Sequence, residues 1–470
     1  MLASSVALTH VTIVDVTGGP SQPDMTVIIT GNRISAITRS DSAATPEAAV
    51  VVNGRYKFLI PGLWDMHVHA AWSGMSQPLG ELFVANGVTG VRDMWGDRSE
   101  IAAWKARVAR FDARTPRIVA AGNLLDGPEP VGPNSIPVAT PDAARRIVDR
   151  LRGRADFIKV YGHLPREVYF AIAAEARANG VIFAGHVPIA VTAAEASDSG
   201  QRSIEHLTGV TLACSARGDE AQRAIVRTVA ERGYAMASAL AHREEAQLAA
   251  DFDVTRCREL AERFARNGTW QVPTLTVLHS QAWRGDSSLQ YDPRLQYIPL
   301  FIRQRWVTRV DPAVIGAADP EARRALYRRQ LRIVGLLQSA GVPILAGTDE
   351  LNPYSLAGFS LHDELERLVE AGLTPLEALQ TATLNPANFL RAIDSSGTLA
   401  VGKLADLVVL DGDPLADIRN VSRIHAVIVN GRLVDGAARQ QLLTDASRAQ
   451  GRPRRIQPTR LPTGARRPGF

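Results

Sequence analysis

Short apolar segments alternate with helical stretches through the middle of this chain. Such alternation is typical of an α/β fold, in which helices connect parallel strands and cover their sheet. Eight such segments lie within residues 61–396, which fits a (β/α)8 TIM barrel with insertions. The predicted strands are Leu63–His69, Val88–Met94, Arg117–Ala121, Phe157–Tyr161, Val181–His186, Ser203–His206, Gln271–Val277 and Ile344–Gly347.

Both ends of the chain have the pattern of strands and turns, without helical periodicity. We therefore predict that residues 1–60 and 397–440 together build a small β-sandwich domain. Residues 441–470 hold seven arginines and four prolines after position 447, which predicts a basic, disordered tail. The net charge is +5 and becomes slightly negative without those arginines, so nucleic-acid binding is not expected.

The sequence sets few limits on compartment. No apolar run approaches the roughly 18 residues that cross a bilayer, so no membrane span is predicted. The first residues lack a charged segment followed by an apolar one. We expect a cytoplasmic protein, or a periplasmic or secreted one if a signal peptide has been removed. A homo-oligomer is possible.

The longest insertion in the predicted barrel covers residues 208–269. It is charged, has a helical pattern, and is a candidate lid over the barrel mouth. The only two cysteines of the chain, Cys214 and Cys257, lie in this insertion. They fit a disulfide in an exported protein and equally fit two reduced, buried thiols.

Chemically active side chains gather where the predicted strands end. Active sites of parallel barrels lie at the carboxyl ends of the strands. His67 and His69 share one face of the first strand, because residues i and i+2 of a strand point the same way. The six candidate ligands at strand ends are His67, His69, Lys159, His186, His206 and Asp349. Imidazoles and a carboxylate on one mouth predict a metal site.

Lys159 is one of only four lysines in the chain, and it stands inside an apolar strand. Burial favours the neutral amine, which can capture carbon dioxide and become a carbamate that bridges two metal ions. A buried ion pair with an aspartate is the alternative. Asp349 has an alternative as well, because aspartate is a common N-cap of helices.

Other polar residues receive smaller roles. Tyr161, two residues beyond Lys159 on the same strand face, is a candidate for holding the substrate carbonyl. His163, His242 and His279 could each face the substrate, although each is more simply explained as an ordinary polar residue, and of the three His163 is taken as a candidate for substrate contact. His362 lies on an amphipathic helical stretch and is expected to be structural.

These segments resemble the amidohydrolase superfamily. The resemblance rests on Pro61-Gly62-Leu63-Trp64-Asp65-Met66-His67-Val68-His69, Phe157-Ile158-Lys159-Val160-Tyr161, Gly185-His186-Val187-Pro188, Ile204-Glu205-His206-Leu207 and Gly347-Thr348-Asp349. It extends over almost all of residues 8–436 and is nearest to imidazolonepropionase-like members that keep the lysine of strand four. Xaa-dipeptidases and ochratoxin-type amidases belong to this group.

The resemblance implies a site with two divalent ions, usually Zn²⁺. His67, His69 and Asp349 would hold the more buried ion, and His186 and His206 the more exposed one. Carboxylated Lys159 would bridge them. Two such ions acidify a bridging water, which then supplies hydroxide near neutral pH, and Asp349 would act as the catalytic acid and base.

For the substrate, the resemblance implies a small molecule with an amide bond, in a dipeptide or an N-acyl amino acid. Hydrolysis of cyclic amides, lactones or phosphotriesters at the same two ions is the alternative. A barrel kept as a non-catalytic binding scaffold is a third possibility, but none of the expected ligands is missing from the sequence.

Overall fold

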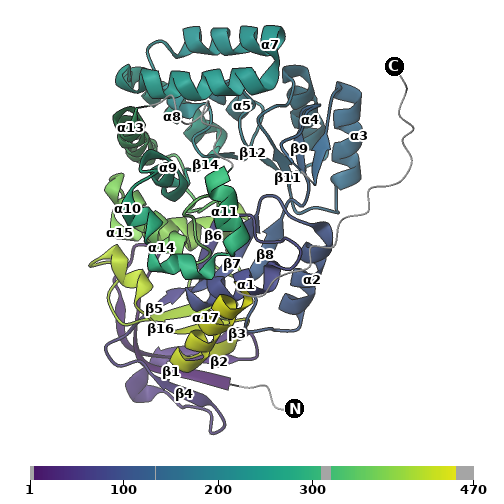
Figure 1. Cartoon of the computed structure of the whole chain (residues 1–470). Coiled ribbons are helices and arrows are strands. Elements are labelled where there is room, and N and C mark those ends of the chain that lie inside the picture. The colour runs from purple at the N-terminus through teal and green to yellow at the C-terminus, as the bar shows by residue number, and fades with distance from the viewer. Residues whose placement is uncertain (1–4, 133, 309–318, 451–470) are drawn as a thin grey trace.

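The computed structural model describes residues 5–132, 134–308 and 319–450. Both ends of the chain build one eight-stranded sheet, at the bottom of the view in Figure 1. Its order is β17 (Arg432–Val434), β16 (Ile424–Val429), β15 (Leu407–Leu410), β5 (Phe58–Pro61), β1 (Ser5–Ile13), β2 (Gln22–Thr30) and β3 (Arg33–Arg39), with β4 (Val50–Asn53) beside β1. The strands form a single hydrogen-bonded sheet, so the β-sandwich stays a prediction.

The C-terminal part of this sheet is buried on both faces. Successive side chains of β15 point to opposite faces, as they do in any strand. Leu407 and Val409 pack against residues of β1 and β2 such as Leu8. Val408 and Leu410 pack into the large core of the central region. The terminal sheet is thereby fixed to the part of the chain that carries the candidate site.

The central strands are parallel, which confirms the predicted α/β class. One sheet has the order β10 (Ser135–Pro137), β9 (Leu124–Asp126), β11 (Ile158–Val160), β12 (Phe183–Gly185), β13 (Ser203–Glu205) and β14 (Trp270–Val272). A second sheet contains β6 (Leu63–Val68), β7 (Val88–Asp93) and β8 (Arg117–Ala120). The sequence pattern missed the short strands β9 and β10, whose turn-rich surroundings resemble a loop.

Isolated backbone hydrogen bonds lie between these two parallel sheets. The Asp156 amide donates to the carbonyl of Ala120, the last residue of β8. On the other side, the Leu345 amide donates to the Gln271 carbonyl, and the Met66 amide donates to the Ala346 carbonyl. No continuous ladder joins the two sheets in the residues that the structure describes.

Two predicted strands are shorter in the structure than the sequence pattern indicated. The segment Ile344–Gly347 makes only one bridge, between Ile344 and Gln271. The segment predicted to reach Val277 ends as a strand at Val272, because Pro273 has no amide hydrogen and Thr274 is in the left-handed region with φ 50°. Helix α9 (Leu275–Ala282) begins directly afterwards.

The helices follow the strands of the two parallel sheets. They are α1 (Ser76–Ala85), α2 (Arg98–Ala109), α3 (Pro141–Leu151), α4 (Arg166–Ala178), α5 (Ala193–Asp198), α10 (Ser287–Gln290), α11 (Leu300–Thr308), α13 (Pro320–Ser339), α14 (Phe359–Glu370), α15 (Pro375–Thr381) and α16 (Leu384–Phe389). Among the described residues, no helix has both the length and the apolar character needed to cross a bilayer.

The prediction of disorder from residue 441 onward was wrong for its first ten residues, 441–450. They belong to α17 (Gly436–Gln450), which buries Leu442 and Ala446 against the core. Arg439 also donates to the backbone carbonyl of Ala85 at the end of α1. These contacts outweigh the local polarity of the segment. Residues 451–470 lie outside the described part of the chain.

The predicted insertion is helical. It contains α6 (Val210–Ala213), the long α7 (Gly218–Gln247) and α8 (Val254–Asn267). Gly233 interrupts α7 with φ 80° and ψ 174°, so α7 consists of two helical halves. Cys214 and Cys257 form a disulfide, which closes the chain segment that carries α7. In Figure 1, α7 lies at the end of the molecule opposite the terminal sheet.

Candidate metal centre

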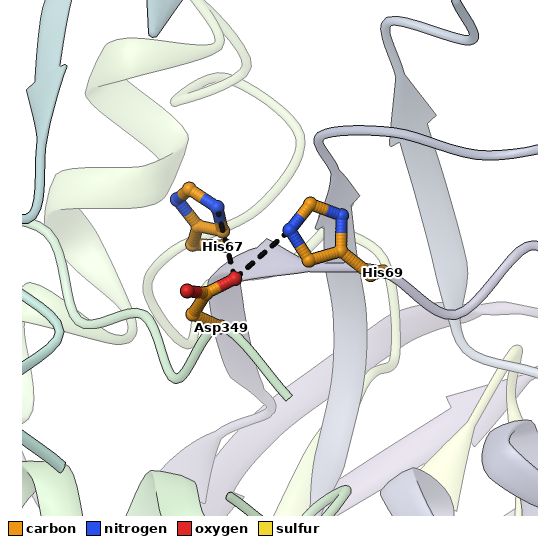
Figure 2. Close-up of side chains that lie close together, drawn as sticks. All are labelled: His67, His69 and Asp349. Atoms are coloured by element: carbon orange, nitrogen blue, oxygen red, sulfur yellow. Dashed lines mark ion pairs between the residues drawn. The ribbon is translucent and has the colours of Figure 1, made fainter. Parts of the chain in front are cut away.

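Three of the predicted ligands form a compact cluster. His67 lies near the end of β6, and His69 is the first residue after this strand. Asp349 follows the segment Ile344–Gly347, which bridges to β14. Ligand atoms of the three residues all lie within 4.8 Å of one another. Asp349 Oδ1 is 2.8 Å from His69 Nε2 and 3.4 Å from His67 Nε2, as Figure 2 shows. Their polar atoms therefore converge on one small volume.

The Asp65 carboxylate binds the backbone next to the metal-ligand candidates His67 and Asp349. Its carboxylate accepts hydrogen bonds from the amides of His67 and Thr348 and from the Thr348 hydroxyl. The Asp349 amide donates to the His67 carbonyl at 2.7 Å, and Asp349 itself has φ 53°. Aspartate tolerates this left-handed conformation better than most residues do. Asp65 thus fixes His67 and Asp349 relative to each other.

The imidazole of His67 is oriented by a buried ion pair. Its Nδ1 lies 2.7 Å from Glu205 Oε2, and Arg92 Nη2 donates to both oxygens of Glu205. A carboxylate partner keeps the proton on Nδ1, so the Nε2 lone pair points toward Asp349. Burial, and then the charge of Lys159, lowers the pKa of His67 well below its usual value. The ring is neutral, as a metal ligand must be.

His206 and His186 lie beside this cluster. The ring centroid of His206 is 4.5 Å from that of His67 and 4.9 Å from that of His186, and His206 Nε2 is 3.8 Å from Asp349 Oδ2. Thr274 donates its hydroxyl proton to the Pro273 carbonyl and therefore accepts from His206 Nδ1 at 2.7 Å. The Nε2 lone pair of His206 is left free on the side of Asp349.

Lys159 is fully buried on β11 among these residues. Burial lowers its pKa to about 8, although the charges of Glu205 and Asp349 act in the opposite direction. Its Nζ lies 5.9 Å from the ring centroid of Tyr161 and has no hydrogen-bond partner among the described residues. The alternative ion pair with an aspartate is not formed within the described part of the chain.

The donor set fits divalent metal ions. Four buried atoms have no hydrogen bond of good geometry in the described residues, namely His67 Nε2, His69 Nδ1, Lys159 Nζ and Asp349 Oδ1, of which Asp349 Oδ1 makes only the ion-pair contacts with the two imidazoles. Unsatisfied buried polar atoms are costly and rare, and a metal ion is one way to satisfy several of them together. Imidazole nitrogen and carboxylate oxygen are the ligands that zinc and related ions take in proteins.

The predicted substrate residues lie next to these side chains. Tyr161 stacks on His186 with ring centroids 4.1 Å apart. His163 points to α7, where its Nε2 lies 3.1 Å from the Ser238 hydroxyl and its ring lies 5.5 Å from Tyr234. The site therefore extends from the strand ends to the second half of α7.

The remaining histidines are placed as follows. His362 is buried and its Nε2 contacts the carbonyl of Asn86 at 2.9 Å, in line with the predicted structural role. His279 stacks on Trp283 at 4.3 Å. The sequence reasoning missed Trp95, whose ring centroid lies 6.1 Å from that of His69. It stands two residues beyond the end of β7, where a strand-end search would find it.

Comparisons with known proteins support the predicted resemblance. A family model described as "Amidohydrolase family" matches residues 58–434. The solved structure named "AH, Bottromycin amidohydrolase" is 26% identical with a TM-score of 0.71 and covers 95% of this chain and 91% of its own. A Xaa-Pro dipeptidase with bound methionine in the active site is 20% identical with a TM-score of 0.65 over 92% and 100%, which shows a shared fold.

Curated relatives match over shorter segments. An imidazolonepropionase from Pseudomonas savastanoi pv. phaseolicola (strain 1448A / Race 6) is 39% identical over 120 residues, which are 24% of this chain and 30% of that protein. The chain spans less than a third of the length of this relative and of the adenine deaminases that it also matches. Together with the family match, these results confirm the imidazolonepropionase-like resemblance.

Proposed function

This chain belongs to the amidohydrolase family, and from this premise we propose that it is a metal-dependent hydrolase of an amide bond in a dipeptide or an N-acyl amino acid. The main observation behind this proposal is that buried nitrogen and oxygen atoms without hydrogen bonds, from distant segments of the chain, meet in the cluster of His67, His69 and Asp349. Family membership supports chemistry on C–N bonds. The name of the similar bottromycin amidohydrolase refers to amide hydrolysis as well.

We also propose the arrangement of the barrel and domains. The isolated hydrogen bonds from Asp156, Leu345 and Met66 lie where an eight-stranded barrel would close, and they support closure. Residues 61–396 would form this barrel, and residues 1–60 and 397–440 the small domain. The candidate ligands would then surround the barrel mouth.

Two divalent ions, of which Zn²⁺ suits these donors best, would be held by the predicted ligands. His67, His69 and Asp349 would hold one ion, and His186 and His206 the other. Such ions supply an acidified water as nucleophile and polarise the substrate carbonyl. The neutral amine of Lys159 would add to carbon dioxide with loss of one proton, and the resulting carbamate would supply further oxygen ligands for the ions.

Asp349 would move the proton during hydrolysis. Burial alone would raise the pKa of this carboxyl, but His206 and His69 outweigh it and bring the pKa to about 2, so the carboxylate is ionised. It would accept a proton from the attacking water at Oδ2 and deliver it to the leaving nitrogen. The Tyr161 hydroxyl would hold the carbonyl oxygen, and His163 would contact the remainder of the substrate.

The experiment combines a metal count with a substrate screen. The purified protein is analysed for bound metal and assayed on dipeptides and N-acyl amino acids, with cyclic amides, lactones and phosphotriesters as the competing panel. We expect close to two ions per chain and turnover of the amides. Lys159→Ala should lose metal and activity, whereas the matched variant Lys105→Ala, at a partly exposed ion pair with Asp156, should keep both.

Two outcomes would contradict the proposal. Turnover confined to lactones or phosphotriesters would replace the amide substrate by the alternative. Two ions per chain with no turnover on either panel would favour a non-catalytic scaffold.

A further inference from the structure

The second half of α7 carries a polar stripe that faces the candidate site. At 3.6 residues per turn, four polar side chains fall within an arc of about 80°. We call these residues the α7 stripe: Tyr234, Ser238, His242 and Glu245. The neighbouring face of the same helix is apolar and packs against Leu212 and Ile225 through Ala237, Leu240 and Ala241. This packing fixes the direction in which the stripe points.

Contacts at the start of the stripe orient it toward the strand ends. Tyr234 and Ser238 both contact His163, which follows β11. One turn farther on, His242 lies on the same face of the helix as Tyr234 and Ser238. The second half of α7 therefore lies beside the end of β11. Glu245 lies about 10 Å beyond Ser238 along the helix axis, on the same face.

Glu245 has no hydrogen bond or ion pair with any described residue, although its side chain is half-buried. Its neighbour Glu244, in contrast, lies 4.0 Å from Arg243. Burial lowers the pKa of His242, so this imidazole is neutral near pH 7 and does not neutralise Glu245. A half-buried carboxylate without a paired cation among the described residues is expensive for the folded protein. A bound cation would offset this cost.

We propose that Glu245 is a specificity-determining residue that binds a cationic nitrogen group of the substrate, a protonated amine or a guanidinium. The inference rests on the proposed amide hydrolysis and names its substrate class. The cationic group comes either from the free α-amino group of a dipeptide or from a basic side chain. Both donate charge-assisted hydrogen bonds to a carboxylate. Tyr234 and Ser238 line the path between this group and the strand ends.

The test uses matched substrate pairs on the metal-loaded protein. Lys-Ala and norleucine-Ala differ in charge on the acyl side, Ala-Lys and Ala-norleucine differ on the leaving side, and N-acetylation removes the α-ammonium charge. The wild type should prefer the cationic member of one of these pairs by about tenfold or more in kcat/KM, mainly through KM. The pair that shows the preference identifies the source of the charge.

Glu245→Gln should abolish the preference by raising KM for the cationic substrate about tenfold more than for its neutral partner. The matched control Glu231→Gln, at an exposed position in the first half of α7, should keep the preference. Glu245→Lys should reverse it. An equal loss on both members of a pair would mean that Glu245 only supports the fold, and equal rates on all pairs in the wild type would overturn the inference while amide hydrolysis stands.

A binding measurement can test the cation site even if the proposed amide hydrolysis is wrong. If no amide is hydrolysed, the binding of lysine and of norleucine to the metal-loaded protein is compared by calorimetry. Tighter binding of lysine that disappears in Glu245→Gln would support a cation site in a protein of different activity. Equal binding of the two amino acids would exclude a side-chain cation. Equal binding of norleucine and N-acetylnorleucine, which differ in the α-ammonium charge, would exclude the other source and so overturn the cation site.

Discussion

The two sides of the candidate site are held in different ways. His67 and Asp349 are fixed by fully buried groups, including the carboxylates of Asp65 and Glu205. The α7 stripe is half-buried or exposed, and it stands on an insertion that an apolar cluster and a disulfide attach to the rest of the chain. One side is a network of buried charges, and the other is a covering helix.

The difference separates chemistry from selectivity. A buried network loses several kcal/mol when one charged member is removed, so it tolerates little change. A half-buried helix face tolerates substitution at much smaller cost, because its side chains keep contact with solvent. We infer that the metal-binding side sets the reaction, while α7 sets which amide is accepted.

The largest effect is expected at Asp349. Asp349→Asn keeps the shape of the side chain but removes the carboxylate that accepts and delivers the proton. We expect kcat to fall by about 10²–10⁴-fold. Steady-state kinetics and a metal count on the same sample measure the effect. Asp394→Asn at an exposed position is the matched control and should have wild-type kinetics. Activity retained by Asp349→Asn would exclude Asp349 as the proton carrier.

A strong loss of stability is expected at Glu205. Glu205→Gln removes the charge that pairs with Arg92 and orients His67, and it leaves a buried guanidinium without its partner. The free energy of unfolding should fall by about 3–5 kcal/mol, and metal affinity by about 10–100-fold. Denaturant unfolding and metal titration measure these changes.

The control for Glu205 is an ion pair on the surface. Glu195→Gln breaks a partly exposed pair with Arg166 and should cost less than about 1 kcal/mol. Equal costs for the two variants would show that the buried pair has no special importance for the metal-binding side.

The sequence predicted the strand-end ligands because their position follows from general rules. His67 and His69 share a strand face, and parallel strands bring their carboxyl ends together. The groups that orient them were missed, although signals existed. Asp65 is two residues before His67 on the same strand face, and Glu205 is directly before His206 inside an apolar strand. A charge inside a strand does not reveal its partner, and Arg92 lies on another strand.

Tertiary contacts decided the features that local pattern could not predict. The strand predicted to reach Val277 ends at Val272, and local rules could have indicated this end because Pro273 follows. Residues 441–450 are helical because Leu442 and Ala446 pack against the core. Likewise, the sequence predicted a helical insertion but not which face of α7 is turned to the site, since that depends on the packing of Ala237 and Leu240.

Removal of the disulfide would test how strongly it attaches the insertion with α7 to the rest of the chain. Replacing Cys214 and Cys257 by serine opens a loop of sequence separation 43, which should lower the free energy of unfolding by up to about 4 kcal/mol. KM should rise because α7 is less well fixed, while metal content stays unchanged. Unfolding and kinetics of the oxidised wild type and the double variant measure this. Loss of metal in the double variant would show that the two sides are not independent.

The smallest effect is expected from Glu245 without substrate. Burial raises the pKa of this carboxyl to about 7, above its usual value near 4.3. Between these two pH values the folded protein holds a proton that the unfolded chain has released, so the free energy of unfolding decreases as pH rises through this window. Glu245→Gln removes that decrease. The variant should match the wild type near pH 4 and be more stable by about 1–3 kcal/mol near pH 8.

The comparison of the wild type with Glu245→Gln is controlled by measuring the stability of both proteins over the whole pH range. All other titrating groups are present in both proteins, so the difference between their stability curves isolates Glu245. Suppose that Glu245→Gln has a higher free energy of unfolding near pH 8 and also loses the preference for cationic substrates. The carboxylate then lowers stability but serves binding, as expected for a binding residue. Identical curves would mean that Glu245 is already neutralised in the free protein, and the covering side would then carry no unpaired charge for a substrate.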